Sequence, residues 1–325
     1  MKPSNADSQF IQIIKDATSA PSSHNTQPWK FKIDKQQIII TPDFTKRLKV
    51  VDPDDHALFI SLGCALENLL LSAKAHGYSP KVEMNFTGDQ NEIIVDLLKN
   101  GNEQKDFLYD FVATRQSTRN KYDAEPIVPD LIDQLKTSNS YDEVEIIFFT
   151  DKEQIKKLKP YIIEGSNRQF NNKEFVNELI TWIRFNEKTA KKMGDGLWGP
   201  CTGSPNVPKF IGKIVVKNFT SAKSEVKRWS NLINKSAGFA LFVAKDNSKV
   251  NWVKLGQSFQ RFGLRATQLN IKHAHANMPC EELEVRKKLI RELNLLNKHP
   301  LLLVRFGYAE KMPYSFRRPV EEVLS

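Results

Sequence analysis

The segment Ala20-Pro21-Ser22-Ser23-His24-Asn25-Thr26-Gln27-Pro28-Trp29 lies between a predicted helix and a predicted strand. Before it, residues 8–18 place apolar side chains at helical spacing, and after it residues 29–33 alternate as in a strand. Two prolines stiffen the backbone, while small hydroxyl and amide side chains supply hydrogen-bond donors and acceptors. Such a loop suits recognition of the edge of a flat polar heterocycle. The alternative is a helix-to-strand turn capped by its own Ser and Asn side chains.

Length, composition and charge limit the classes of protein to consider. The 325 residues are 40% hydrophobic and 26% charged, which is typical of a globular protein and excludes wholesale disorder and fibrous repeats. No run reaches the ~18 apolar residues of a membrane span, so we expect no membrane partner. Residues 1–5 show no signal-peptide pattern, and we expect a cytoplasmic location unless a leader precedes them. The net charge of +10 is dispersed, and basic and aromatic residues do not interleave, so we expect no nucleic-acid partner.

The sequence predicts no metal site. Residues 52–55, Asp-Pro-Asp-Asp, lack the glycine and distal glutamate of a calcium loop, so helix capping explains them better. His273 and His275 lie two apart on a predicted helix, where they cannot share a metal on one face. His24 has no Ser/Asp arrangement around it that would indicate a catalytic triad. The cysteines are widely spaced and odd in number, which fits neither a zinc site nor a disulfide framework: Cys64, Cys201 and Cys280.

Two long helical stretches are predicted outside the loop. The first, Asp55 to His76, carries apolar residues around most of its circumference, so it must be buried on nearly all sides. The second, Val253 to Ala274, ends in a segment, 273–279, that echoes residues 74–80 and suggests an internal duplication. Strands are expected at residues 29–33, 38–40, 82–86, 144–149 and 301–306.

The middle of the chain carries a candidate lid. Residues 151–192 are predicted to be helical, and the Gly/Pro-rich loop 194–212 that follows is long enough to form a lid or a site wall. The apolar face of this loop is expected to consist of Leu197, Trp198, Pro200 and Pro205.

Two arginine-bearing segments are candidates for binding an anion. Arg115 and Arg119, in Arg-Gln-Ser-Thr-Arg, are four apart, so on a helix they share a face and could both contact one phosphate. Ser117 between them would add a hydroxyl, and a helix start nearby would add backbone donors. Arg317 and Arg318 lie in a basic tail. In both segments the alternative is a solvated surface without a ligand.

Together these segments resemble the FMN-dependent nitroreductase superfamily. The decapeptide is similar to that family's Pro-Ser-Ser-x-Asn-x-Gln-Pro-Trp segment, and residues 115–119 are similar to its Arg-x-Ser-x-Arg/Lys phosphate motif. Residues 306–308, Phe-Gly-Tyr, and residues 317–323, Arg-Arg-Pro-Val-Glu-Glu-Val, resemble its C-terminal strand and basic tail. The resemblance spans nearly the whole chain, with only a diffuse match over 151–248. It implies an α+β, nitroreductase-like three-layer α-β-α sandwich.

The order of the motifs is similar to that of the single-chain, tandem-repeat (Acg-like) branch of the superfamily. Ordinary members dimerise, and each flavin is held by the arginine motif and basic tail of one subunit plus the Pro-Ser-Ser loop of the other. Here a first repeat, residues 1–110, keeps only the loop. A second repeat, residues 111–325 with a lid-like insertion around 151–212, keeps only the arginine motif and the tail. The resemblance therefore implies two interleaved repeats in a single-chain pseudo-dimer, able to act as a monomer, with one complete flavin site.

The resemblance implies an FMN-dependent NAD(P)H oxidoreductase that reduces a small aromatic or quinone-like acceptor, with NADH or NADPH as electron donor. No side chain need act as an acid or base, so no catalytic residue is predicted. The alternative is a relative without turnover that binds or sequesters flavin, or has lost the cofactor, because the insertion could cover the substrate face. The expected cofactor-binding residues are Pro21, Ser22, Ser23, Asn25, Arg115, Gln116, Ser117, Arg119, Arg317 and Arg318.

Overall fold

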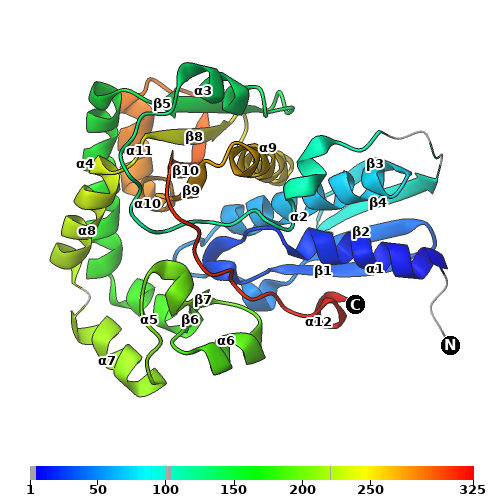
Figure 1. Cartoon of the computed structure of the whole chain (residues 1–325), viewed down its shortest axis with the longest axis horizontal. Helices are drawn as coiled ribbons and strands as arrows, with labels where there is room; N and C mark the ends of the chain where they lie inside the picture. Colours follow the sequence, from blue (N-terminus) through cyan, green and yellow to red (C-terminus); the bar gives the residue numbers. More distant parts are fainter. Residues whose placement is uncertain (1–4, 89, 100, 102–103, 220) are drawn as a thin grey trace.

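The computed structural model describes residues 5–88, 90–99, 101, 104–219 and 221–325, and its main elements are two four-stranded sheets with helices between and outside them (Figure 1). Neighbouring strands within both sheets run antiparallel. Helices and antiparallel strands are both well represented along the chain. The predicted α+β class is therefore confirmed.

The first sheet comes from the N-terminal third of the chain and has the order β1-β2-β4-β3. The predicted hairpin is present, with Phe31 opposite Ile40. Alternate residues place their side chains in the core on one face only, where helices α1 (Asn5–Thr18) and α2 (His56–Ala75) cover the sheet. The strands are β1 (Trp29–Asp34), β2 (Gln37–Pro42), β3 (Tyr78–Asn85) and β4 (Glu92–Lys99).

The second sheet has the order β5-β8-β10-β9 and is covered on both faces. Helix α9 (Lys249–Gln268) packs on one face, and α4 (Lys152–Asn171) and α8 (Ala222–Asn234) pack on the other (Figure 1). This half therefore has the predicted helix, sheet and helix layers. The strands are β5 (Val144–Phe149), β8 (Gly238–Ala244), β9 (Lys272–His275) and β10 (His299–Gly307).

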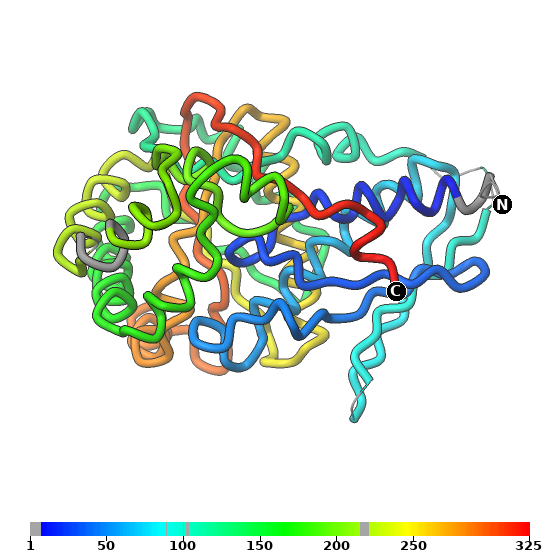
Figure 2. Tube along the Cα trace, turned by 90° about the horizontal axis from the view of Figure 1, so that it is seen from below, coloured from blue at the N-terminus to red at the C-terminus, as the bar shows by residue number. Residues whose placement is uncertain are grey.

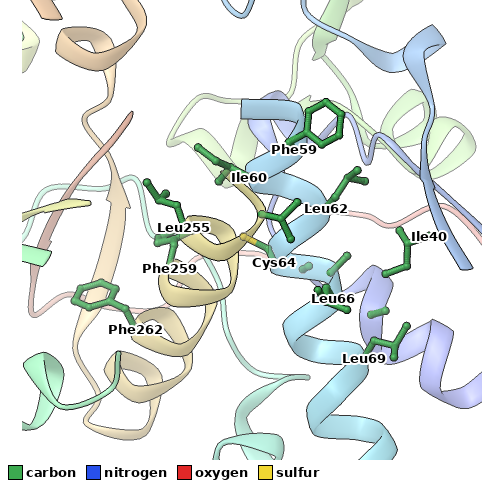
Figure 3. Close-up of a cluster of buried hydrophobic side chains, with 14 of the residues drawn as sticks. Ile40, Phe59, Ile60, Leu62, Cys64, Leu66, Leu69, Leu255, Phe259 and Phe262 are labelled. Atoms are coloured by element: carbon green, nitrogen blue, oxygen red, sulfur yellow. The ribbon is translucent and has the colours of Figure 1, made fainter. Parts of the chain in front are cut away.

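Helices α2 and α9 cross at the centre of the molecule, as the sequence predicts (Figure 3). Their contact depends on two glycines: a Cβ on Gly63 would lie 2.0 Å from the Val253 carbonyl oxygen, and one on Gly256 would lie 2.0 Å from that of Ile60. Cys64 at the same crossing donates to the Gly256 carbonyl at 3.2 Å. By length and composition α2 could cross a membrane, but 94% of that window is buried inside the molecule, as in a core helix.

The second long helix ends earlier than predicted. Helix α9 stops at Gln268, and Asn270 then adopts a left-handed φ of 57°. Residues 272–275, expected to be the end of the helix, instead form strand β9, paired with β10. Residues 273–279 resemble residues 74–80 in sequence, but the first segment begins in a strand and the second begins at the end of a helix. The two segments are therefore not equivalent in structure. The predicted repeat boundary at 110/111 stays a prediction.

The predicted helical stretch 151–192 is broken into three helices, because Asn172 and Asn186 each begin a new one with a side-chain cap. The C-terminal tail crosses back to the first sheet, where the Ser325 N–H donates to the Phe31 carbonyl at 2.9 Å (Figure 2). The remaining elements are α3 (Pro129–Lys136), α5 (Lys173–Trp182), β6 (Ile183–Arg184), α6 (Glu187–Met193), β7 (Leu197–Trp198), α7 (Lys209–Phe219), α10 (Met278–Glu281), α11 (Leu283–Glu292), α12 (Val320–Val323) and four short 3-10 turns.

Candidate functional site

The loop between α1 and β1 has an unusual backbone. His24, Asn25 and Gln27 adopt positive φ values of 49°, 55° and 53°. Each left-handed residue other than glycine costs about 1–2 kcal/mol, and such conformations concentrate at functional sites. The Ser22 hydroxyl accepts from the Gln27 N–H at 2.9 Å, so part of the loop is a self-capped turn, the alternative that its composition left open.

Asn25 and Gln27 bind other parts of the chain. Asn25 Nδ2 donates to the carbonyls of Gly196 at 3.0 Å and Phe316 at 3.1 Å. Gln27 Nε2 donates to the Gly194 carbonyl at 2.8 Å, and Gln27 Oε1 accepts from the Arg318 N–H at 2.9 Å. The loop therefore holds together the insertion around residues 194–196 and the C-terminal tail. The sequence pattern did not indicate these partners.

The segment 115–119 is not helical, so the prediction that Arg115 and Arg119 share one face of a helix is wrong about the backbone. It is extended beside β9: Ser117 forms a bridge with His273, and the Thr118 N–H donates to the His273 carbonyl at 2.9 Å. Residues at i, i+2 and i+4 of an extended chain point to one side. Arg115 and Arg119 therefore share a side, as predicted, and the extended backbone adds Ser117 to it. The backbone conformation differs from the prediction, and no helix begins in this segment to add backbone donors.

Three predicted arginines, Arg115, Arg119 and Arg317, converge and are called the arginine cluster below. Arg115 donates to the Ser19 carbonyl at 3.1 Å, Arg119 to the Cys201 carbonyl at 3.4 Å, and Arg317 to Asn25 Oδ1 at 2.9 Å. Burial, with added repulsion from Arg119, lowers the pKa of Arg115 to about 10, and burial with repulsion from Arg115 and Arg119 lowers the pKa of Arg317 to about 9. The three charges thus face one another in a poorly solvated place.

No carboxylate forms an ion pair with the arginine cluster within the described ranges. The acidic side chains that act on the cluster are the thiols of Cys64 and Cys201 and the phenols of Tyr122 and Tyr314. Burial raises the pKa of both thiols and of Tyr122, so these three groups are neutral. The buried Nε of Arg115 has no hydrogen-bond partner among the described atoms. Burying unpaired charge is costly, so the cluster is suited to an anion from outside the chain.

The other predicted residues of these two segments are engaged away from the cluster. Arg318 donates to the Gln27 carbonyl at 2.6 Å and lies 3.8 Å from the Asp43 carboxylate. Gln116 anchors the tail, since its side chain both donates to the Met312 carbonyl and accepts from the Met312 N–H at 2.9 Å. Both residues therefore support the tail, and the structure brings neither to the arginine cluster.

A cavity of about 550 Å³ lies beside the cluster, within the usual range of small-molecule sites. Of the predicted residues, Ser22, Ser23 and Arg119 line it, while Pro21 lines a smaller hollow next to it. The insertion forms a wall, as expected, and contributes Leu197 and Pro205. The other two residues of its expected apolar face do not line the cavity: Trp198, which packs against Phe316, and Pro200.

Two histidines that the sequence analysis set aside also line the cavity. Burial and the Arg119 charge lower the pKa of His24 to about 4 and of His275 to about 3, so both imidazoles are neutral at pH 7. His273 and His275 share a face because they lie on strand β9 rather than on a helix, and both contact the Phe259 ring. Recognising 272–275 as a strand would have revealed this.

Arg305 was also missed. It lines the cavity from strand β10, is 1% exposed, and donates to the carbonyls of Arg119 and Asn120 at 2.8 Å each. Its guanidinium lies 4.0 Å from the centre of the Tyr122 ring. The signal was a single arginine inside the apolar run 301–306, because charged residues are rarely fully buried unless they are paired.

Asp52, Asp54 and His56 are the described group whose ligand atoms lie close enough to hold a metal ion. These side chains are bonded to one another and to the backbone, and only the buried Nε2 of His56 has no hydrogen-bond partner among the described atoms of the three. The Asp52 carboxylate accepts from the N–H groups of Ala57 at 3.0 Å and Leu58 at 2.9 Å, which confirms the predicted capping of the helix. Burial alone would lower the pKa of His56, but hydrogen bonds to both aspartates raise it to about 9. A proton on His56 thus balances these carboxylates.

The fit of FMN to this site can be judged from the residues present. Its phosphate carries nearly two negative charges at neutral pH. The arginine cluster supplies one buried and two half-buried arginines, an unpartnered Nε and no competing carboxylate in the described segments. Charge-assisted bonds from arginine to phosphate are the strong type of hydrogen bond. The residues present therefore fit the phosphate of the cofactor that the sequence resemblance implies.

Comparisons with known proteins agree with the resemblance at the level of the superfamily. No protein-family model matches the chain. Two curated proteins named "Putative NAD(P)H nitroreductase", from Mycobacterium tuberculosis strains CDC 1551 / Oshkosh and H37Rv, are each 20% identical over 96% of this chain and 90% of their own length. This near full-length similarity supports a nitroreductase-like superfamily.

Solved structures with nitroreductase names also match at low similarity. A nitroreductase-like family protein from Bacillus cereus is 13% identical with a TM-score of 0.41, covering 67% of this chain and 95% of that one. A nitroreductase with bound FMN from Bacteroides fragilis is 13% identical with a TM-score of 0.39, covering 66% and 94%.

Proposed function

We propose that this protein is an FMN-dependent NAD(P)H oxidoreductase that reduces a small aromatic or quinone-like acceptor. One observation carries the proposal: buried Arg115 and half-buried Arg119 and Arg317 converge without a carboxylate in the described part of the chain, beside a cavity lined by the Pro-Ser-Ser loop. The full-length similarity to proteins named as NAD(P)H nitroreductases supports it. If the cofactor were not FMN, the arginine cluster would need another anionic group in the position proposed for the FMN phosphate.

In this proposal, Arg115, Arg119 and Arg317 bind the FMN phosphate, and Ser117 contributes its hydroxyl. When bound, FMN supplies hydride transfer between a reduced nicotinamide and the acceptor. Ser22 and Ser23 lie at the cavity and would contact the flavin. The insertion excludes water from the cavity through its apolar wall.

The proposed stoichiometry is one FMN per chain. The loop belongs to the first predicted repeat, and the arginine cluster belongs to the second. Two hydrogen bonds connect them: Arg115 donates to the Ser19 carbonyl and Arg317 donates to Asn25 Oδ1. These contacts join the two halves of one site. The second set of motifs that a symmetric dimer would need is not in the sequence.

A flavin-binding protein without turnover is the second candidate, and the attachment of the insertion favours it. The Gly196 N–H donates to the Asn25 carbonyl at 3.0 Å, and Asn25 Nδ2 donates back to the Gly196 carbonyl at 3.0 Å. A cover bonded directly to the cofactor loop could hold flavin and keep an acceptor out. Both candidates share the phosphate site and differ only in access.

Spectroscopy and calorimetry test the proposal in two steps. The purified protein, incubated with FMN, is expected to show flavin absorbance that saturates at one FMN per chain. Anaerobic NADH or NADPH should bleach this absorbance, and a quinone or nitroaromatic should restore it. Bound flavin that neither nicotinamide bleaches would support the second candidate.

Arg115→Ala tests the binding step, with Arg291→Met as the matched control. FMN binding should weaken about tenfold or more, while riboflavin binding stays unchanged, because riboflavin has no phosphate. Arg291→Met, on an exposed part of α11, should change neither affinity. Equal binding of both flavins by wild type and Arg115→Ala would remove the physical basis of the proposal.

A further inference from the structure

Arg305 is a buried cation that the proposed cofactor site does not use. Its Nη2 donates to two backbone carbonyls, but its buried Nε and Nη1 have no hydrogen-bond partner among the described residues. Unsatisfied buried donors cost about 1–3 kcal/mol each, and more when charged. Strand β10 holds this side chain against the cavity, so its free donors call for a ligand there.

The charges around Arg305 are cationic. Arg119 and Arg228 are the nearest other charged groups, and both line the same cavity. Two carboxylates line it as well, but each is already bound: Glu225 accepts from Arg228 at 2.9 Å, and Glu281 accepts from Gln169 at 2.7 Å. Neutral His24 and His275 complete the titratable lining, with pKa values lowered mainly by burial. Arg119 and Arg305 therefore have no carboxylate partner at this end of the cavity within the described residues, whereas Arg228 is paired with Glu225.

The rest of the lining is largely apolar. Helix α5, the insertion and helix α8 contribute Phe175, Leu179, Phe185, Leu197 and Trp229. Aromatic and aliphatic walls favour a flat apolar body. A ligand that satisfies both parts of the cavity has an acid group at one end and an aromatic ring next to it.

The geometry points to an acid-binding subsite, in which Arg305, assisted by Arg119 and Arg228, binds the carboxylate of an aromatic acid that serves as the acceptor. This inference rests on the proposed function and specifies its substrate class. The subsite is separate from the phosphate position, because Arg115 and Arg317 are bonded to residues 18–20 and do not line the cavity. Of the three arginines of the cluster, Arg119 is the one that also lines the cavity, so the two positions share it.

A matched pair of probes tests the subsite: 4-nitrobenzoate and its neutral analogue 4-nitrobenzamide. The FMN-loaded protein is titrated with each, followed by the change in flavin absorbance, and kcat/KM is measured with the preferred nicotinamide. Wild type should bind the acid at least tenfold more tightly than the amide. In Arg305→Met this preference should disappear through loss of acid binding, while amide binding stays within twofold.

Three further variants separate charge from folding. Arg305→Lys keeps the positive charge but loses the planar guanidinium that can donate two hydrogen bonds to a carboxylate, so it should retain part of the preference. Arg228→Gln changes a half-exposed side chain that pairs with Glu225, and should lower the preference about threefold, so the test survives if Arg305→Met does not fold. Arg291→Met, on the exposed surface, should behave as wild type.

Two results would overturn the subsite. One is equal binding of acid and amide by wild type. The other is a loss of FMN preference over riboflavin in Arg305→Met, which would assign Arg305 to the cofactor phosphate. Failure of the proposed function looks different: if neither nicotinamide bleaches the flavin, or no flavin binds, calorimetry of the purified protein with 4-nitrobenzoate still measures the preference and its dependence on Arg305.

Discussion

Buried charges are handled in opposite ways in two regions of this molecule. In the insertion, Arg184 donates twice to the Asp195 carboxylate, at 2.6 and 3.1 Å, and Lys46 reaches the same carboxylate at 2.9 Å. In the arginine cluster, Arg115 and Arg317 donate to backbone carbonyls and to the Asn25 side chain, and no carboxylate pairs with either of them in the described segments. The first region carries its own counter-charge, and the second does not.

The histidines repeat this contrast. His56 at the start of α2 is bonded to Asp52 at 3.0 Å and to Asp54, and its pKa is raised to about 9. His24 at the cavity lies near Arg119, and its pKa is lowered to about 4, chiefly by burial. Charges that serve the fold are therefore neutralised within the chain. The cavity keeps an excess of positive charge, which is what a site for an anionic ligand requires.

The largest effect is expected where an internal counter-charge is removed. Asp195→Asn leaves Arg184 buried and without a carboxylate, which should lower the free energy of unfolding by about 3–5 kcal/mol. Urea unfolding at pH 7 measures it. Asp133→Asn, which breaks the exposed pair with Lys136, is the matched control and should cost less than about 1 kcal/mol. If the two variants lose equal stability, internal pairing does not distinguish the two regions.

The next effect is a stability profile with two opposite pH limbs. His24 has a folded pKa of about 4, below its unfolded value of 6.5, so its contribution is present above pH 6.5 and is lost as pH falls toward 4. His56 has a folded pKa of about 9, so its contribution is complete below pH 6.5 and is lost as pH rises through 9. Each shift corresponds to roughly 3 kcal/mol.

Unfolding of the flavin-free protein between pH 4 and pH 10 tests both limbs. His24→Asn, which tolerates the left-handed backbone at this position, should flatten the acid limb in part, because His275 also titrates there with a pKa lowered to about 3. His56→Gln should flatten the alkaline limb. An acid limb that is identical in wild type and His24→Asn would contradict the burial of a neutral imidazole.

Local patterns in the sequence were sufficient to predict much of the fold. The hairpin of β1 and β2 follows from alternation around a short turn, and the burial of α2 follows from its nearly continuous apolar surface. Strands β4 and β8 were missed, the second because its seven residues are all buried and show no alternation. Segment 272–275 was taken for helix because the turn at Asn270 depends on one left-handed residue.

The candidate site could be predicted only in part, for a physical reason. The motifs name candidate residues for binding an anion, because the arginine spacing and the loop residues are local features of the sequence. Whether an arginine is paired depends on long-range contacts: Arg318 approaches Asp43, while its neighbour Arg317 turns to Asn25. The cavity itself is formed by elements more than a hundred residues apart, so neither His275 nor Arg305 could be assigned to it from spacing.

Adjacent arginines give the third prediction. Arg317→Met removes a cation of the arginine cluster and should weaken FMN binding about tenfold or more without affecting riboflavin. Arg318→Met should leave the ratio of FMN to riboflavin affinity unchanged and instead lower stability, because the Gln27 and Trp29 carbonyls lose their donor. Calorimetric titration with both flavins measures the ratio. If the two variants exchange these effects, the tail binds phosphate through Arg318.

The smallest effect is expected at Asn25, where the loop contacts the cluster. On sequence alone, Asn25 faces the flavin ring, so Asn25→Ala should weaken FMN and riboflavin equally. In the structure Asn25 Oδ1 accepts from Arg317 at 2.9 Å and therefore orients an arginine that we propose to bind the phosphate. The variant should lower FMN affinity about fivefold more than riboflavin affinity, which corresponds to about 1 kcal/mol for one orienting hydrogen bond.

Asn25 also holds the Gly196 and Phe316 carbonyls, so Asn25→Ala should melt at a lower temperature than wild type. The affinity ratio separates the two roles, because loosening of the insertion affects both flavins alike. Combining Asn25→Ala with Arg317→Met should change the ratio no further than Arg317→Met alone, since the orienting bond has nothing left to orient. Additive losses would show that Asn25 contacts the ligand itself, as its sequence motif suggests.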